Sequence, residues 1–319
     1  MRRAISIFAI GFHTLCASAP SLAGMQKDLK DCAAANRAES ADACTRILAS
    51  GRLPKQQYYI AYFNRAWSYR NADDDVKALA DFNRAAKFHS RYSRTYASRA
   101  LVHSDLGNLA EAVHDLDRAI ALNPGDWSAF FSRAVIQRKL LRHEDALADL
   151  DRAAQLKKDE AKVGIIRALV LAELGRSDAA QDQIEVLATR DASKADIAYL
   201  RGVVALRDRN LSDALAHANS AIDLEAEFTA AYALKGQIME ARGDQAAAKS
   251  AYERSLALPP RLLDAKRAKL LAQDRIATLT GTLPPPNAEA HNETSAASAN
   301  LGCRRYIPGA SLTIAIPCD

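Results

Sequence analysis

Histidine, cysteine and arginine are the residues through which this chain could do chemistry, so their spacing decides which sites are possible. A zinc-protease helix needs two histidines flanking a glutamate, but His143-Glu144 is followed by no second histidine at the required position. Glycine-rich nucleotide loops and the G-x-S-x-G turn around a nucleophilic serine do not occur. The other histidines beyond residue 23 are dispersed along the chain, at His89, His103, His114, His217 and His291. We therefore predict no enzyme: no catalytic, cofactor-binding or metal-binding residue.

Basic residues recur at a constant 34-residue step and could form a row of anion-binding side chains. The series runs Arg65, Arg99, Arg133, Arg167, Arg201 and Lys235. Aspartates repeat at the same step, at Asp81, Asp115 and Asp149. Because a guanidinium and a carboxylate match in charge and hydrogen-bond geometry, a structural Arg–Asp ladder explains both series. We favour that ladder over a ligand site and place the partner-binding surface elsewhere.

Composition and charge point to helices and argue against nucleic acid. The chain has 319 residues and is rich in Ala, Leu, Arg, Asp and Glu, residue types that favour a helix, while aromatic residues make up 6%. Its 43 basic and 38 acidic residues leave a net charge of +5, with no uninterrupted run of Lys or Arg. That mild and evenly spread charge predicts no nucleic-acid partner.

Residues 1–23 have the pattern of a secretory signal peptide. Arg2 and Arg3 precede a short apolar stretch, and small residues at Ser21 and Ala23 suit cleavage after Ala23. An uncleaved membrane anchor is the alternative, but the apolar run is shorter than the roughly 20 residues that a spanning helix needs. We expect an exported, periplasmic or secreted protein with no membrane span in its mature chain.

A second repeated feature accompanies the basic series at the same 34-residue step. A small residue follows each basic one, at Ala66, Ala100, Ala134, Ala168, Gly202 and Gly236. An alanine lies twelve positions later, at Ala78, Ala112, Ala146, Ala180, Ala214 and Ala248. Small residues allow two antiparallel helices to approach closely, so each window predicts a helical hairpin. Turn signals such as Gly107-Asn108 and Gly243-Asp244 separate the two helices.

The length and internal pattern of these windows resemble the tetratricopeptide repeat, a helix–turn–helix unit of about 34 residues. An aromatic residue opens several windows, as at Tyr62, Tyr96, Phe130 and Tyr232. The resemblance covers about residues 59–262, as six repeats. It implies an all-α fold, a right-handed superhelical solenoid whose concave groove is lined mainly by the first helix of each hairpin. Residues 263–279 should cap the last hairpin.

The same register predicts a degenerate first hairpin over residues 24–58. One 34-residue step back from Ala66 reaches Cys32, and the same step back from Ala78 reaches Cys44. The two cysteines therefore take the closest-approach positions of that hairpin, where a disulfide can form. We predict a Cys32–Cys44 bond, with two free buried cysteines as the alternative.

The C-terminal segment differs from the repeats. Residues 280–302 are rich in Thr, Pro, Asn, Ala and Ser, a composition typical of a disordered linker. In residues 303–319, Pro308-Gly309 is a turn signal and Cys303 and Cys318 lie on either side of it. We predict a small disulfide-closed hairpin that is an appendage, and the alternatives are a strand offered to a partner's sheet and a mostly disordered tail.

The resemblance implies a binding surface on the concave groove formed by first helices. Candidate contact residues on that face are Phe63, Trp67, Arg70, Asn71, Arg94, Phe131, Arg138, Lys139 and Tyr199. Phe63 and Trp67 occupy positions where some relatives carry a Lys/Asn clamp for carboxylates, so that clamp is not expected here. The function predicted is a non-catalytic scaffold that binds a protein or peptide. A glycan-binding module of the cell envelope and an enzyme or non-catalytic enzyme subunit are the alternatives.

Overall fold

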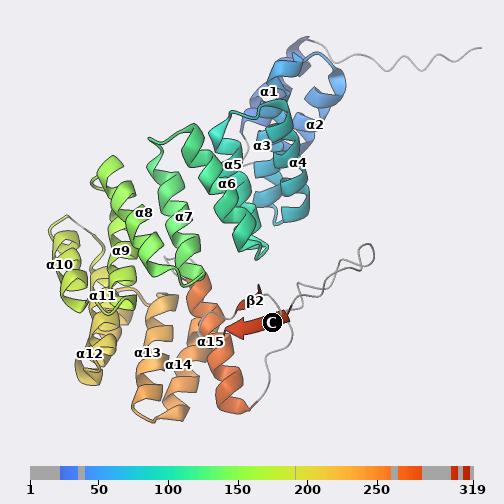
Figure 1. Ribbon diagram of the computed structural model, residues 1–319. Helices are drawn as coiled ribbons and strands as arrows, with labels where there is room; N and C mark the ends of the chain where they lie inside the picture. The colour runs from blue at the N-terminus through green and yellow to red at the C-terminus, as the bar shows by residue number, and fades with distance from the viewer. Residues whose placement is uncertain are drawn as a thin grey trace, which may run out of the picture. The chain divides into compact units, whose positions relative to one another are not determined.

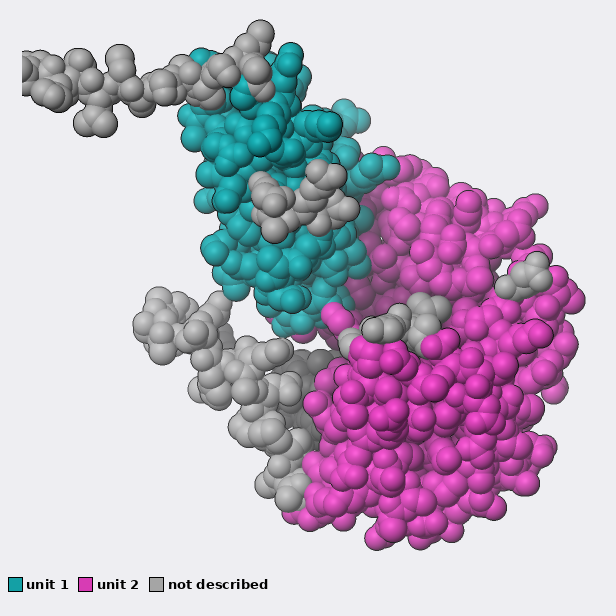
Figure 2. Space-filling view, turned by 180° about the vertical axis from the view of Figure 1, so that it is seen from behind, with its two compact units in different colours: residues 1–106 teal, residues 107–319 magenta. Residues whose placement is uncertain are grey.

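The computed structural model describes residues 22–34, 40–190, 192–259, 265–281, 303–307 and 312–316. These residues form antiparallel helical hairpins and one two-stranded sheet (Figure 1). The chain divides into two compact units, residues 1–106 and 107–319, coloured separately in Figure 2. The predicted all-α repeat architecture is confirmed in both units.

Unit 1 contains two complete hairpins followed by the first helix of a third. Its elements are α1 (Leu22–Ala33), α2 (Ser40–Ser50), the 3-10 turn η1 (Lys55–Gln57), α3 (Tyr58–Asn71), α4 (Asp75–Phe88) and α5 (Ser93–Asp105). Ala66 on α3 and Ala78 on α4 have no exposed surface, as expected of closest-approach positions. Phe82, also fully buried, fills the space beside them and forms the centre of a small apolar cluster.

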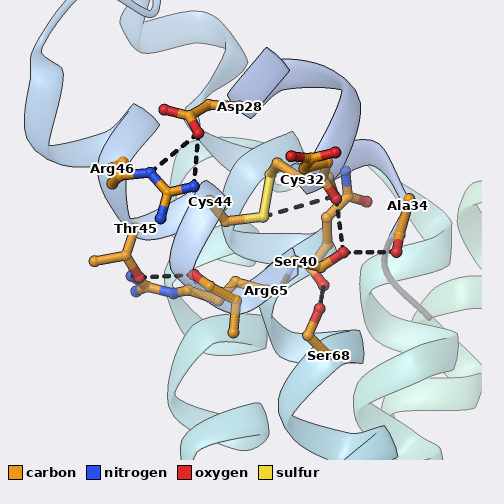
Figure 3. Close-up of a disulfide and its surroundings, with 12 residues drawn as sticks. Asp28, Cys32, Ala34, Ser40, Cys44, Thr45, Arg46, Arg65 and Ser68 are labelled. Atoms are coloured by element: carbon orange, nitrogen blue, oxygen red, sulfur yellow. Dashed lines mark hydrogen bonds and ion pairs between the residues drawn. A yellow bond between two sulfur atoms is a disulfide. The ribbon is translucent and has the colours of Figure 1, made fainter. Parts of the chain in front are cut away.

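The predicted disulfide joins the two helices of the first hairpin (Figure 3). The Cα atoms of Cys32 and Cys44 are 4.7 Å apart, and both side chains are buried. Arg46 of α2 pairs with Asp28 of α1 at 2.7 Å, which adds a second link across the hairpin. Arg65 of α3 donates a hydrogen bond to Oγ1 of Thr45 at 2.8 Å and so ties the hairpin to its neighbour.

Unit 2 stacks four complete hairpins between the single helices α6 and α15. Its helices are α6 (Leu109–Leu122), α7 (Trp127–Lys139), α8 (His143–Leu156), α9 (Ala161–Glu173), α10 (Ser177–Ala188), α11 (Lys194–Arg207), α12 (Leu211–Leu224), α13 (Thr229–Ala241), α14 (Gln245–Ala257) and α15 (Ala265–Thr280). One apolar core extends from α7 to α13 and includes Ala268 of α15, because each hairpin buries its face against the next, and a smaller cluster joins α13, α14 and α15. Gly236 is required in that stack, since a Cβ there would collide with the ring of Tyr252.

The turn inside each of the six hairpins predicted from residue 59 onward has a residue with positive φ at the same place. At the 34-residue step these are Asp73, Gly107, Leu141, Gly175, Arg209 and Gly243, with φ between 57° and 81°. Glycine adopts this left-handed conformation without steric cost, whereas other L-residues do so at a cost of roughly 1–2 kcal/mol. The sequence therefore contains glycine at three of the positions that favour it and a costlier residue at the other three.

Arg209→Gly should raise the free energy of unfolding by about 0.5–1 kcal/mol, because glycine removes the backbone strain of the turn. Arg209 has φ 59° and its side chain is exposed. Arg209→Ala is the matched control, since it removes the same side chain and keeps the strain. Urea unfolding of the three proteins checks the prediction, and equal stability of the two variants would contradict it.

The C-terminal strands β1 (Cys303–Ile307) and β2 (Leu312–Ile316) pair antiparallel, with Cys303 opposite Ile316 and Ile307 opposite Leu312. This agrees with the predicted hairpin. The second half of that prediction, a bond between Cys303 and Cys318, lies outside the described residues, as do residues 282–302 of the predicted linker and residues 1–21 of the predicted signal peptide. Thr280, the first residue of the predicted linker, belongs to α15.

Candidate functional site: the first-helix face

A stripe of large side chains runs along α3 in unit 1, on the face predicted to bind a partner. It consists of Tyr59, Phe63, Trp67 and Arg70, which recur at every third or fourth position and therefore share one side of the helix. All four are half-buried. Ile60 lies beside them with 43% of its surface exposed. The chain itself leaves this α3 stripe partly open to solvent.

Ring contacts hold the α3 stripe in place. Phe63 and Trp67 both meet the buried ring of Phe82 edge to face, with centroids 5.7 and 6.3 Å away. Tyr92, which precedes α5, contacts Phe63 at 5.5 Å and Tyr59 at 5.1 Å. Such pairs add stabilisation beyond the area they bury. The rings are thus fixed before any partner arrives, which lowers the entropic cost of binding.

Arg70 completes the stripe at the C-terminal end of α3. Its guanidinium lies 5.2 Å from the ring centroid of Trp67, within the range of a cation–π contact. It also pairs with Asp105 of α5 at 2.7 Å. Asn71 and Arg94 are exposed at the end of α3 and the start of α5. The structure therefore brings Phe63, Trp67 and Arg70 together, as the sequence suggested.

A second aromatic group lies at the start of α7 in unit 2. Phe131 packs against Trp127 with centroids 6.3 Å apart. The ammonium group of Lys162 lies 4.8 Å from the Trp127 ring and 5.7 Å from the Phe131 ring. Lys139, at the end of the same helix, is half-buried. Tyr199 is only 8% exposed, because its ring packs against Phe228.

Arg138 belongs to a buried ion cluster. Its guanidinium donates two hydrogen bonds to Glu173 of α9, both 2.8 Å long. Arg267 of α15, 94 residues further along the chain, reaches the same carboxylate at 2.6 Å, and Nδ1 of His143 lies 3.3 Å from it. Arg138 is 5% exposed, and the Glu173 side chain 9%. This Glu173 cluster joins α7, α8, α9 and α15.

The electrostatics of the Glu173 cluster favour the charged carboxylate. Burial raises the pKa of Glu173, but the charge of Arg138, the contact with His143, the Arg138 hydrogen bonds and the charge of Arg267 outweigh it. The pKa of Glu173 therefore lies well below its ordinary value. In a solenoid each repeat usually contacts only its neighbours. The Arg267 contact departs from that rule, because α15 reaches back past α13 and α11 to α9.

The repeated arginines form a ladder that is more regular than the sequence suggested. Arg65 pairs with Asp81 and Arg133 with Asp149, both at 2.6 Å, which confirms pairing to the residue 16 positions later. A second rung points to the residue 16 positions earlier, in the preceding hairpin. It is formed by Arg99 with Asn83, Arg133 with Asp117, Arg167 with Asp151 and Arg201 with Glu185. Each rung joins a first helix to one second helix of the stack.

The second rung was missed although the sequence contained its signal. Asn83, Asp117, Asp151 and Glu185 recur at the same 34-residue step and are polar throughout. These contacts link adjacent hairpins, so the arginines have a structural role in the stack.

The two partners of Arg133 should differ greatly in their contribution to stability. Both carboxylates lie 2.6 Å from the guanidinium, but the Asp149 side chain is 7% exposed and that of Asp117 53%. Asp149→Ala should cost about 2–3 kcal/mol because it leaves Arg133 half-buried without its inner partner. Asp117→Ala should cost less than about 1 kcal/mol, since water replaces an exposed partner. Chemical denaturation measures the free energy of unfolding of both variants. Equal losses would contradict the larger contribution expected of the buried Asp149.

Within the described ranges, no group of three or more His, Cys, Asp or Glu side chains is placed to hold a metal ion. None of the helices there has both the length and the apolar character that a membrane crossing requires.

Comparison with known families matches the repeat region. A family profile described as tetratricopeptide repeat matches residues 98–161 and 167–228, and a second profile of that description matches residues 229–261. No curated protein matches the chain significantly.

Solved structures with the same arrangement of helices share little sequence with this chain. A tetratricopeptide repeat protein from Parabacteroides merdae ATCC 43184 has a TM-score of 0.66 at 15% identity, over 78% of this chain and 97% of its own. YrrB, described as a TPR protein with an unusual peptide-binding site, gives 0.50 at 23% identity, over 64% and 99%. PilW, a type IV pilus biogenesis factor, gives 0.53 at 16% identity, over 67% and 99%. These likenesses concern the fold alone.

Proposed function

Since this chain is a tetratricopeptide repeat protein, we propose that it is a non-catalytic scaffold that binds another protein or peptide through the first-helix face of unit 1. The α3 stripe is the observation that carries the proposal. Trp and Arg dominate the energetics of protein interfaces, and here Trp67 and Arg70 stand side by side on one helix. The peptide-binding site named for YrrB supports a role of this kind.

Unit 1 is favoured because its face is the more accessible of the two. Of the unit 2 positions that correspond to Phe63 at the 34-residue step, Ile165, Tyr199 and Ala233 are 4%, 8% and 2% exposed, whereas Phe131 is half-buried. Arg138 corresponds to Arg70 and is buried with Glu173, whereas the Arg70 side chain remains 24% exposed. Lys139 of unit 2 is half-buried as well. A partner would therefore bury the most accessible apolar surface by covering the α3 stripe.

The proposed place of action is the periplasm or an equivalent exported space. The signal-peptide pattern of residues 1–23 supports export, and a disulfide is typical of oxidising compartments. Cell fractionation with N-terminal sequencing of the mature protein tests this. A cytoplasmic protein that retains Met1 would contradict it.

Site-specific photocrosslinking in cells tests the binding function. A photoreactive amino acid at Trp67 should capture a discrete protein, because that position lies in the proposed interface. The control places the same residue at Val76 of α4, which is 74% exposed in the same unit but lies outside the stripe. Capture of the same species from both positions, or of no protein from Trp67, would rule out the proposed surface.

A further inference from the structure

Unit 1 carries an unusual combination of charge and aromatic residues. Residues 43–72 and 82–104 contain ten Lys or Arg and no Asp or Glu. The same two segments contain ten of the 20 aromatic residues of the chain, which has 2 Trp, 10 Tyr and 8 Phe. They include most of α2, all of α3, the second half of α4 and most of α5, so the α3 stripe lies within this basic region.

Part of this positive charge is neutralised inside the unit. Arg65 and Arg84 share the carboxylate of Asp81, and Arg70 pairs with Asp105. Four other cations are exposed, and their side chains form no hydrogen bond or ion pair with any described residue: Lys55, Lys87, Arg91 and Arg94. Charge that the described residues do not balance is available to a partner.

The four exposed cations lie close to aromatic residues in the sequence. Lys55 lies just before Tyr58, and Lys87 directly precedes Phe88, which is 43% exposed and stacks on Tyr62 at 5.6 Å. Arg91 and Arg94 lie on either side of Tyr92, whose ring contacts Phe63 of the α3 stripe. Positive charge and apolar ring surface therefore occur together at the end of unit 1 where α3 and α5 begin.

We infer that this end of unit 1 is the docking site for an acidic peptide segment of another protein, one in which Asp or Glu alternates with aromatic or aliphatic side chains. The inference rests on the proposed function and specifies the chemistry of the partner. Carboxylates would pair with Lys55, Lys87, Arg91 and Arg94, which accelerates association and selects the partner by charge. Apolar side chains would pack against the α3 stripe and Ile60 and supply most of the affinity.

The ring geometry favours a peptide over a nucleic acid or an acidic polysaccharide. Bases and sugars bind by stacking on open aromatic faces. Here Phe63 and Trp67 each form a T-shaped contact with Phe82, Tyr92 forms one with Phe63, and Phe63, Trp67 and Tyr92 are half-buried, so none of these three rings is fully open to a stacking ligand. Exposed Ile60 adds an aliphatic surface, which suits side chains.

Binding of defined polyanions to the full mature chain tests this inference. The probes are a fluorescent Glu/Tyr copolymer, poly-glutamate without rings, polygalacturonate and oligo-dT. We expect the Glu/Tyr copolymer to bind most tightly. The double variant Arg91→Glu/Arg94→Glu should weaken its binding at least about tenfold, because both side chains are exposed and the substitution reverses their charge.

The matched control reverses two exposed cations of unit 2, Lys157→Glu/Lys158→Glu, and should change the affinity less than about twofold. Equal losses in the two double variants, tighter binding of polygalacturonate or oligo-dT, or no binding of the Glu/Tyr copolymer would each overturn the inference. If a photoreactive residue at position Trp67 captured a protein but the copolymer did not bind, the inference of an acidic partner would be wrong and the proposed function would still hold.

Discussion

Glu173→Gln should lower the free energy of unfolding of unit 2 by about 3–5 kcal/mol, because it leaves two guanidiniums at a poorly hydrated site without their shared carboxylate. Arg138 is 5% exposed and depends on Glu173 for two hydrogen bonds. Arg267 should also lose its attachment, so α15 should separate first. Hydrogen exchange of residues 265–281 together with urea unfolding measures the effect.

The pH dependence of this loss follows from the lowered pKa of Glu173 in the folded protein. In the unfolded chain the carboxyl titrates near its ordinary value of about 4.3. The stabilisation is therefore fully present above that pH and decreases as the pH falls below it toward the folded-state pKa. The difference between wild type and Glu173→Gln should be largest at neutral pH and shrink in acid.

Glu144→Gln provides the control for the Glu173 cluster. Glu144 also pairs with an arginine, Arg176, at 2.7 Å, but its side chain is 64% exposed. Its loss should cost less than about 1 kcal/mol at any pH. A Glu173 variant as stable as this control would show that Arg267 does not hold α15 in place.

Replacing both cysteines of the first hairpin, Cys32→Ala/Cys44→Ala, should destabilise that hairpin by about 2–4 kcal/mol. The bond closes a short loop, with a sequence separation of 12, and holds a hairpin that has a described neighbour on one side only. Hydrogen exchange of α1 and α2 should rise sharply, while α7 to α14 should stay protected.

A reducing agent separates the disulfide from packing effects. It should raise exchange in α1 and α2 of the wild type and leave exchange there unchanged in the double alanine variant, since only the wild type has a bond to break in that hairpin. If reduction had no effect on exchange in α2, the two buried cysteines would contribute as small apolar side chains and not as a covalent link.

The sequence predicted the hairpins because their packing depends on residue size at fixed spacing. Ala78, Ala146 and Ala214 have no exposed surface, as the 34-residue step required. The same register placed Cys32 against Cys44 even though the aromatic signature is weak in that hairpin. The sequence of a single repeat is enough to predict these contacts, because the two helices of a hairpin meet at positions a fixed number of residues apart.

Contacts between distant helices could not be predicted in this way. Arg138 was a candidate groove residue because its position in the repeat corresponds to that of Arg70. Its burial depends on Glu173 and on Arg267, which is 94 residues away from Glu173. No local sequence pattern predicts the contact between Arg267 and Glu173, because it depends on how the hairpins of unit 2 stack from α9 to α15. The burial of Tyr199 likewise depends on another hairpin, because its ring packs against Phe228 at the start of that hairpin.

The central claim is that the first-helix face of unit 1 binds a partner. The most direct test is to measure the affinity of the captured protein for two matched variants. Ile60→Asp places a charge on that face, and Val76→Asp makes the same change at a more exposed site on α4. Calorimetric titration should show at least about tenfold weaker binding for Ile60→Asp and wild-type affinity for Val76→Asp. Equal affinities of the two variants would contradict the account.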